Sequence, residues 1–348
     1  MVAKDIVVSA GYNRTRGIGL IQNASLNRAR FPFLGSDGIY YDKIDPDLGN
    51  ARPDPGTISI AQPWTNRRRP DPQYSTITYI HNGSWSYYNA LRVTARQRLK
   101  HGLHWMVNYA WSKSIDTGSD YTAGVTLTEF DSARSQRGLS DFHQAHRVNF
   151  NYGYTPPWFK KNWFLGGWTL SGNHTYATGN PFTVTAGYDV NADGVANDRP
   201  ILLDPKLYGR SVDNGRVNPA TGQQISVEQL PLRGFFPTIN TPVGQRVFDP
   251  GGSGKDSLGR NTFFAQGMAN WDAGLYKSFS GWREGHRVQF RAEFYNLLNT
   301  PRFALPTRSA QSLAFGRITS TYNPFNFVGA SRLDDTARML QVSLRYVF

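Results

Sequence analysis

The end of the chain, residues 338–348, alternates between large apolar and mostly polar side chains with a period of two. The apolar positions run to the last residue and are Leu340, Val342, Leu344, Tyr346 and Phe348. Because successive side chains of a β-strand point to opposite faces, this pattern predicts a strand with one apolar and one polar face. A closing strand with a terminal phenylalanine is the usual ending of an outer-membrane β-barrel. We therefore expect the preceding residues to supply further strands that lead up to this one.

The composition narrows the fold class and agrees with this expectation. The chain has 348 residues, a formal net charge of +13 and no cysteine, which excludes a disulfide framework and a thiolate metal site. Aromatic residues make up 14%, and 34 glycines with 20 prolines predict many turns. Mean hydropathy is −0.49, and no apolar run approaches the roughly 18 residues of a transmembrane helix. A polar average is compatible with a membrane barrel, because only alternate residues of its strands face lipid.

Period-two alternation recurs along the chain and predicts an all-β protein of about eight long antiparallel strands. In one such segment, 86–99, Leu91, Val93 and Ala95 alternate with arginine and threonine. No helical periodicity of comparable regularity is present. The predicted strands lie near residues 4–14, 86–99, 103–111, 145–155, 163–178, 269–280, 287–298 and 338–348.

Connections between the predicted strands alternate between short and long. The short ones are residues 100–102, 157–162 and 281–286, and the long ones are 15–85, 117–144, 179–268 and 300–337. Outer-membrane barrels have short periplasmic turns and long extracellular loops, so this parity favours an antiparallel transmembrane β-barrel. If the closing strand ends in the periplasm, the chain is expected to be periplasmic near residues 101, 159 and 283, and outside the cell near 190 and 320.

The two faces of the predicted strands differ as a membrane barrel requires. The apolar face carries aromatic rings near strand ends, which favour the membrane–water interface: Trp111, Tyr154, Trp163, Tyr346 and Phe348. The other face carries charged residues that would cost about 2–4 kcal/mol at the membrane midplane and must line a wet or protein-filled lumen: Arg92, Arg96, Arg98, Arg291, Glu293 and Arg345. A soluble β-sandwich with a solvated charged face is the alternative explanation.

The first residues lack the features of a secretory signal peptide, because Lys4 and Asp5 interrupt a short apolar run. An outer-membrane protein needs such a signal. Residues Ile6, Val8 and Ala10 already alternate like a strand in progress. We therefore expect residues 1–348 to be one β-barrel domain that forms the C-terminal part of a longer protein.

A further set of segments follows in order along most of the chain: Ser86–Leu99, Val107–Asp116, Arg137–Phe142 with His146 and Arg147, Gly166–Trp168, Thr178–Phe182, Phe290–Asn299 and Phe315–Ile318. Together they resemble the C-terminal barrel of TonB-dependent outer-membrane transporters. The resemblance is to the Oar-like kind, which often carries an N-terminal carboxypeptidase-regulatory-like domain. The motifs are specific jointly rather than singly.

The resemblance implies a barrel of about 22 strands with an N-terminal plug domain, and ligand uptake driven by the inner-membrane TonB system. We expect the signal, the plug and the TonB-coupling segment to lie outside residues 1–348, so that this chain would supply the C-terminal part of the barrel. Loops 117–144 and 179–268 would contact an unidentified ligand. The barrel would lie in a Gram-negative outer membrane, against lipid and lipopolysaccharide. The apolar positions from Leu340 to Phe348 would be the signal read by the barrel-assembly machinery.

Two other functions fit the same residues: a small passive or structural outer-membrane barrel such as an adhesin, and a soluble β-rich binding module. We do not expect an enzyme, because no Ser/His/Asp arrangement, phosphate-binding loop or glycosidase-like acid pair is present. The basic run Arg67–Arg69 has no nucleic-acid-binding fold around it and suits lipopolysaccharide better than nucleic acid. His101 and His104, like His143 and His146, are spaced for structural or surface roles rather than for a metal.

One loop carries a candidate calcium site, with ligands Asp189, Asn191, Asp193 and Asp198. The spacing Asp-x-Asn-x-Asp-Gly lets alternate oxygens converge on one ion around a sharp turn. The loop is not an EF-hand, because Pro200 stands where that motif has its bidentate glutamate. An Asx-rich turn without metal is the alternative.

Overall fold

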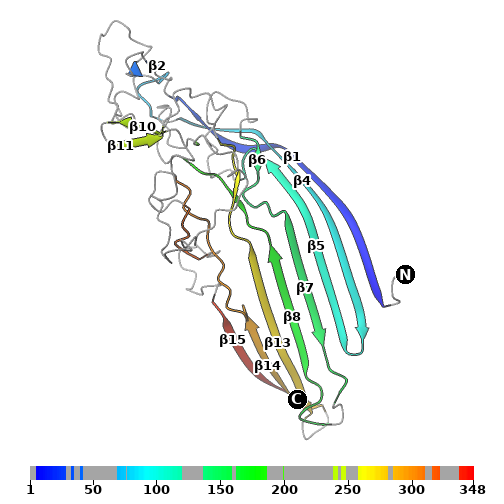
Figure 1. Cartoon of the computed structure of the whole chain (residues 1–348). Coiled ribbons are helices and arrows are strands. Elements are labelled where there is room, and N and C mark those ends of the chain that lie inside the picture. The colour runs from blue at the N-terminus through cyan, green and yellow to red at the C-terminus, as the bar shows by residue number, and fades with distance from the viewer. Residues whose placement is uncertain are drawn as a thin grey trace, which may run out of the picture.

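A computed structural model shows a long, curved sheet of antiparallel strands (Figure 1). Every regular element in the described residues is a β-strand, and none of those residues belongs to a helix suited to crossing a membrane. The structure describes residues 5–28, 33–34, 40–41, 69–75, 77–119, 136–158, 162–185, 199, 238–241, 244–247, 258–280, 285–309, 316–321 and 337–348.

Eight long strands follow one another across the main sheet, each antiparallel to its neighbours. They are β1 (Ile6–Leu26), β4 (Ile77–Lys100), β5 (Leu103–Asp116), β7 (His146–Tyr154), β8 (Thr169–Ala177), β13 (Met268–Ser280), β14 (Arg287–Tyr295) and β15 (Met339–Val347). Short strands form local pairs: β6 (Gly138–Leu139) with β5, β9 (Pro181–Phe182) with β12 (Phe263–Phe264), β2 (Phe33–Leu34) with β3 (Tyr40–Tyr41), and β10 (Thr238–Thr241) with β11 (Gly244–Val247). The predicted all-β fold and the long strands are therefore confirmed.

The hairpin of β1 and β4 is longer than the apolar pattern predicts. These strands have 21 and 24 residues, whereas about 9–11 residues span a membrane. The next two outward positions of β1 beyond Tyr12 are polar, with Arg14 opposite Asn89 and Arg16 opposite Tyr87. Backbone pairing needs no apolar side chains, so the hairpin continues past the apolar band, with irregular register near Leu20.

Short and long connections lie at opposite ends of the sheet (Figure 1). The end with the short turns and the C-terminus is called the turn end here, and the opposite end the loop end. In the tightest turn, His101 and Gly102 have positive φ angles of 50° and 83°. A Cβ on Gly102 would lie 1.9 Å from the carbonyl oxygen of Thr155, so only glycine fits against the neighbouring chain. The connection from β7 to β8 is longer than predicted and spans 155–168.

The strand register collects the apolar residues on one face of the sheet. One row across the strands consists of Val8, Ala95, Val107, Phe150, His174 and Trp271, in which His174 is the one polar member and lies between aromatic rings. Much of this apolar face is exposed: Leu344, at the centre of the last strand pair, keeps 72% of its surface accessible. A contiguous exposed apolar band rimmed by aromatic residues is the surface that lipid covers in a membrane barrel.

Aromatic residues border this band at both ends. At the turn end, Tyr154 contacts Trp158, and Tyr346 contacts Phe348, with ring centroids 6.2 and 6.0 Å apart. At the loop end, the hydroxyl of Tyr109 lies 2.8 Å from Nδ1 of His146. These positions are those that interfacial rings occupy in a membrane protein.

The sheet is open in the described residues: β1 pairs only with β4, and β15 only with β14. β1 starts at the turn end and β15 finishes there, so the two edges run in opposite directions (Figure 1). An unpaired strand edge is not stable in lipid, because its N–H and C=O groups have no water to bond. Both edges therefore require antiparallel partners in the membrane.

Candidate functional site

The second face of the sheet is polar, and side chains on its neighbouring strands form hydrogen bonds with one another. Oγ1 of Thr94 donates to Oδ1 of Asn108 at 2.9 Å, and Nδ2 of Asn149 donates to Oγ1 of Thr175 at 3.0 Å. These residues alternate with the apolar ones along the same strands. The predicted separation of an apolar and a polar face is thus present in these strands.

The polar face is predominantly basic. Exposed arginines project from four strands at Arg92, Arg96, Arg147, Arg291 and Arg345. The acids are fewer and are held by hydrogen bonds: Asp272 accepts from Nδ2 of Asn270 at 2.8 Å and from the Asn296 backbone N–H at 2.9 Å. Such a surface attracts anionic groups, and screening by salt weakens the attraction.

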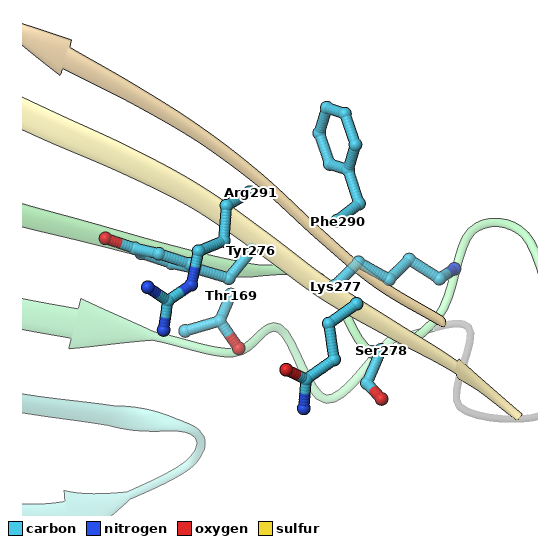
Figure 2. Close-up of a pocket in the computed structure, with 8 residues that line it drawn as sticks. Thr169, Tyr276, Lys277, Ser278, Phe290 and Arg291 are labelled. Carbon is cyan, nitrogen blue, oxygen red and sulfur yellow. The ribbon is translucent and has the colours of Figure 1, made fainter. Parts of the chain in front are cut away.

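A cavity of about 350 Å³ lies near the turn end of β13 and β14. Figure 2 shows Tyr276 and Arg291 side by side, while Phe290 projects from the opposite side of the sheet. The guanidinium carbon of Arg291 is 5.5 Å from the centre of the Tyr276 ring, and the Tyr276 hydroxyl donates to Oε1 of Glu293 at 2.9 Å. With Ser278 and Lys277 also in its lining, the cavity offers hydrogen-bond donors and two cationic side chains, Lys277 and Arg291, to a small polar group.

A cluster of buried polar side chains lies at the loop end and is called the loop-end network here. Its centre is Arg260, whose guanidinium forms an ion pair with Asp116 and donates to the carbonyl oxygens of Asp116 and Gln136 at 3.0 Å. The side chains of Arg260 and Asp116 are only 9% and 2% exposed. Ser119 donates to the second oxygen of Asp116 at 2.8 Å. A buried guanidinium with this many acceptors fixes several loop segments in one arrangement.

Asn261 extends the network to a fourth segment of chain, at Thr183. Its Nδ2 donates to the carbonyl oxygen of Leu139 at 2.6 Å and to Oδ1 of Asp141 at 2.5 Å. Its backbone N–H donates to Oγ1 of Thr183 at 2.9 Å, and Thr183 donates back to Oδ1 of Asn261 at 2.8 Å. Residues 116–119, 136–141, 183 and 260–261 are therefore held together although they are far apart in sequence.

Close backbone contact at two glycines makes this packing possible. A Cβ on Gly138 would lie 2.6 Å from the carbonyl oxygen of Arg260, and one on Gly179 would lie 1.7 Å from that of Ala265. Neither backbone can yield easily, because Leu139 pairs with Ile115 and Ala265 donates to the Asn180 carbonyl at 2.9 Å. The network therefore depends on glycine at both places.

A buried histidine, His143, is hydrogen-bonded to β5, the strand that leads into the loop-end network. Nδ1 of His143 accepts the backbone N–H of Ser114 at 3.2 Å, so the imidazole is neutral. Burial, and to a smaller extent Lys113, lowers the pKa of His143 below its ordinary value of 6.5. The unfolded network then binds more protons than the folded one, so the stability contributed by neutral His143 is complete above 6.5 and is lost as the pH falls below it.

The backbone N–H of Ser140 donates to the Ser114 carbonyl at 3.1 Å. We expect amide hydrogen exchange at Ser114 and Ser140, corrected for the intrinsic rate, to be faster at about pH 5.5 than at about pH 7.5. The His143→Gln variant keeps an acceptor without the titration, so its corrected exchange should not change over this range. Equal pH dependence in both proteins would assign the effect to another group.

The candidate calcium ligands Asp189, Asn191, Asp193 and Asp198 lie outside the described residues. Within the described residues, no group of three or more histidines and acids is arranged to hold a metal. The calcium site remains a prediction from the spacing of its oxygens.

If calcium is bound there, a chelator should increase proteolysis of the segment 185–200, because metal binding and local folding are coupled. The Asp193→Ala variant should be cleaved at the increased rate with or without the chelator. Identical cleavage of the original protein in calcium and in chelator would leave the Asx-turn interpretation.

The structure gives His143 and His146 polar partners. Sequence reasoning did not predict the centre of the loop-end network. His143 is buried in the loop-end network and His146 pairs with Tyr109. Sequence reasoning singled out the segments Arg137–Phe142 and Thr178–Phe182 by resemblance but missed Arg260. Arg260 belongs to no motif that the sequence singles out.

Comparison with known families agrees with the geometry. A family model for the outer membrane beta barrel domain matches residues 1–341. The chain therefore belongs to this family and is an outer-membrane protein, which removes the soluble binding module from consideration. No curated protein matches the chain.

Proposed function

We propose that this chain, as an outer-membrane barrel protein, forms the C-terminal part of a larger TonB-dependent transporter barrel and contributes ligand-contacting loops. One support for the proposal is a resemblance to Oar-like transporters, carried by the segments between Ser86 and Ile318. The remaining strands and the plug domain would come from another part of the same protein. The ligand is a small molecule of unidentified class.

The observation that carries this proposal is the open sheet with exposed arginines on its polar face. In a barrel of about eight strands the interior is just wide enough for side chains to fill it. Arg92, Arg96 and Arg147 are long, charged and close together on the polar face, with Arg92 and Arg147 separated only by Ala110 in the same row. Such a wall suits a wide lumen that holds water or a plug.

The loop-end network would give the transporter a fixed extracellular rim. It anchors both ends of the 117–144 connection, through Asp116 and Asp141, and both ends of the 179–268 connection, through Thr183 and Arg260. Loops held at their bases can present binding residues without being rigid along their whole length. Ligand capture by these loops, followed by passage when TonB pulls the plug, is the mechanism we propose.

Growth of a native host with and without the gene tests this function. Ferric siderophores, oligosaccharides and peptides would each be supplied as the limiting nutrient, in cells with and without a functional TonB system. We expect gene-dependent growth on one class, lost when TonB is inactivated. Gene-dependent growth that persists without TonB would contradict the proposal.

The opposite directions of β1 and β15 favour a second candidate, a passive barrel of about eight strands closed by direct pairing of these edges. A panel of cysteine pairs across β1 and β15 separates the two candidates, since the natural chain has no cysteine. Efficient disulfide formation in the outer membrane would support the small barrel. Absence of any cross-link, with each single cysteine reactive in the unfolded protein, is the result the large barrel predicts.

A further inference from the structure

One residue of the apolar face, Lys277, is charged, and its contacts differ from those of its apolar neighbours. Lys277 lies on β13 between Leu275 and Phe279, in a row with Phe290 and Leu344. Lys277 is nevertheless only 4% exposed. Figure 2 shows its side chain extending toward the connection that precedes β8.

The ammonium group of Lys277 is held by that connection. Nζ donates to the carbonyl oxygens of Trp163 and Phe164 at 2.7 and 2.5 Å. It also lies 4.6 Å from the ring centre of Phe279, 5.2 Å from that of Trp168 and 5.8 Å from that of Phe164. Carbonyl oxygens and ring faces together stabilise a cation away from water.

Residues 162–168, called the aromatic turn here, have a defined conformation of their own. The side chain of Asn162 accepts the backbone N–H groups of Phe164 and Leu165 at 2.9 and 2.8 Å. Nε1 of Trp168 donates to the Phe164 carbonyl at 3.0 Å. The Phe164 carbonyl thus receives both Trp168 and Lys277, which fixes the turn to β13.

The aromatic turn is folded against the apolar face, not the polar one. Trp163 contacts Phe279, and Trp168 contacts Phe290, with ring centroids 5.1 and 5.9 Å apart. The outer side of the turn is apolar as well: Trp163 is 67% exposed, and Phe164 and Leu165 are also exposed. The turn therefore continues the lipid-facing surface at the turn end of the sheet.

We propose that the aromatic turn is an interfacial anchor that inserts into the phospholipid leaflet at the turn end, and that Lys277 is the pin that holds it there. Continuity with the lipid-facing band identifies phospholipid, and not a protein, as the occupant of this surface. Exposed tryptophan and phenylalanine beside backbone carbonyls suit the boundary between headgroups and acyl chains. The inference depends on membrane location alone and is independent of transport.

A single nitroxide tests the anchor in the full-length protein reconstituted in phospholipid bilayers. The label is placed at Leu165→Cys, with His101→Cys in the exposed β4–β5 turn as the control at the same end. The measured quantity is the ratio of the nitroxide's collision rate with oxygen, which enriches in lipid, to its collision rate with a water-soluble nickel chelate. This ratio should be several-fold higher at position 165 than at position 101. Equal ratios, with position 165 accessible to nickel, would overturn the anchor.

The pin is tested in the same assay with Lys277→Met added to Leu165→Cys. Methionine keeps a flexible apolar stem like that of lysine but has no ammonium to bind the two carbonyls. The label should therefore become more accessible to nickel. Lys277→Arg, which keeps donors and charge, should restore the original ratio. An unchanged ratio in Lys277→Met would show that the turn is held without the lysine, and the assignment of the pin would be wrong. The first labelling experiment decides the anchor even if Lys277→Met does not fold.

Discussion

Replacing Arg260 by leucine is expected to destabilise the loop end by about 3–5 kcal/mol, the cost of breaking a buried ion pair by removing one partner. Asp116 would remain 2% exposed and charged, with Ser119 as its remaining side-chain donor. The carbonyl oxygen of Gln136 would also lose the guanidinium. Amide exchange across residues 114–119 and 136–143 should increase sharply, and protease should cleave these segments in the folded protein.

Two variants control for this result. Arg147→Leu removes an exposed arginine of the polar face and should change local stability by less than about 1 kcal/mol. Asp116→Asn combined with Arg260→Leu removes the carboxylate that would otherwise be buried without its ion-pair partner. The double variant should recover part of the stability that Arg260→Leu loses. If Arg260→Leu behaves like Arg147→Leu, the network does not hold the loops in solution.

Placing a charge on the lipid-facing side of β15 is expected to have the second large effect. Leu344→Arg should strongly reduce the amount of protein inserted in the outer membrane, because a lipid-facing arginine costs up to about 2–4 kcal/mol, depending on depth. Ser343→Arg is the matched control: it adds the same side chain one residue away, on the polar face. Equal insertion of the two variants would contradict the assignment of the faces.

Deletion of Phe348 separates assembly from stability. The residue is 90% exposed, and among the rings of the described residues its ring contacts only that of Tyr346, at an interplanar angle of 32°, so it adds little to packing within the sheet. If the terminal aromatic is part of the signal for the barrel-assembly machinery, the deletion should lower the inserted amount while inserted molecules keep near-normal heat resistance. Normal insertion would leave the C-terminal alternation as ordinary strand patterning.

Strands were predictable from the sequence because their side-chain period is a local property. The alternation from Leu340 to Phe348 predicted the strand β15. The alternation of short and long connections predicted that they lie at opposite ends of the sheet. The extension of β1 to Leu26 was missed because it depends on backbone pairing with β4, and its side chains carry no alternation.

The loop-end network was beyond sequence reasoning for a different reason. Arg260 and Asp116 meet across 144 positions of sequence, and loops without a repeating pattern give no register by which to pair them. Lys277 was visible as a polar residue in an apolar series, but its partners are backbone carbonyls, which every residue has. Side-chain identity alone therefore could not indicate that it holds the aromatic turn.

The orientation of the barrel is the most direct test of the central claim, that this sheet crosses the outer membrane with its long loops outside. Single cysteines at Phe142, Ser320, His101 and Arg283 would be treated on intact cells with a membrane-impermeant maleimide, which the cysteine-free chain permits. We predict labelling at positions 142 and 320, and labelling at 101 and 283 only after the outer membrane is opened. Labelling at 101 and 283 on intact cells, with 142 and 320 protected, would contradict the account.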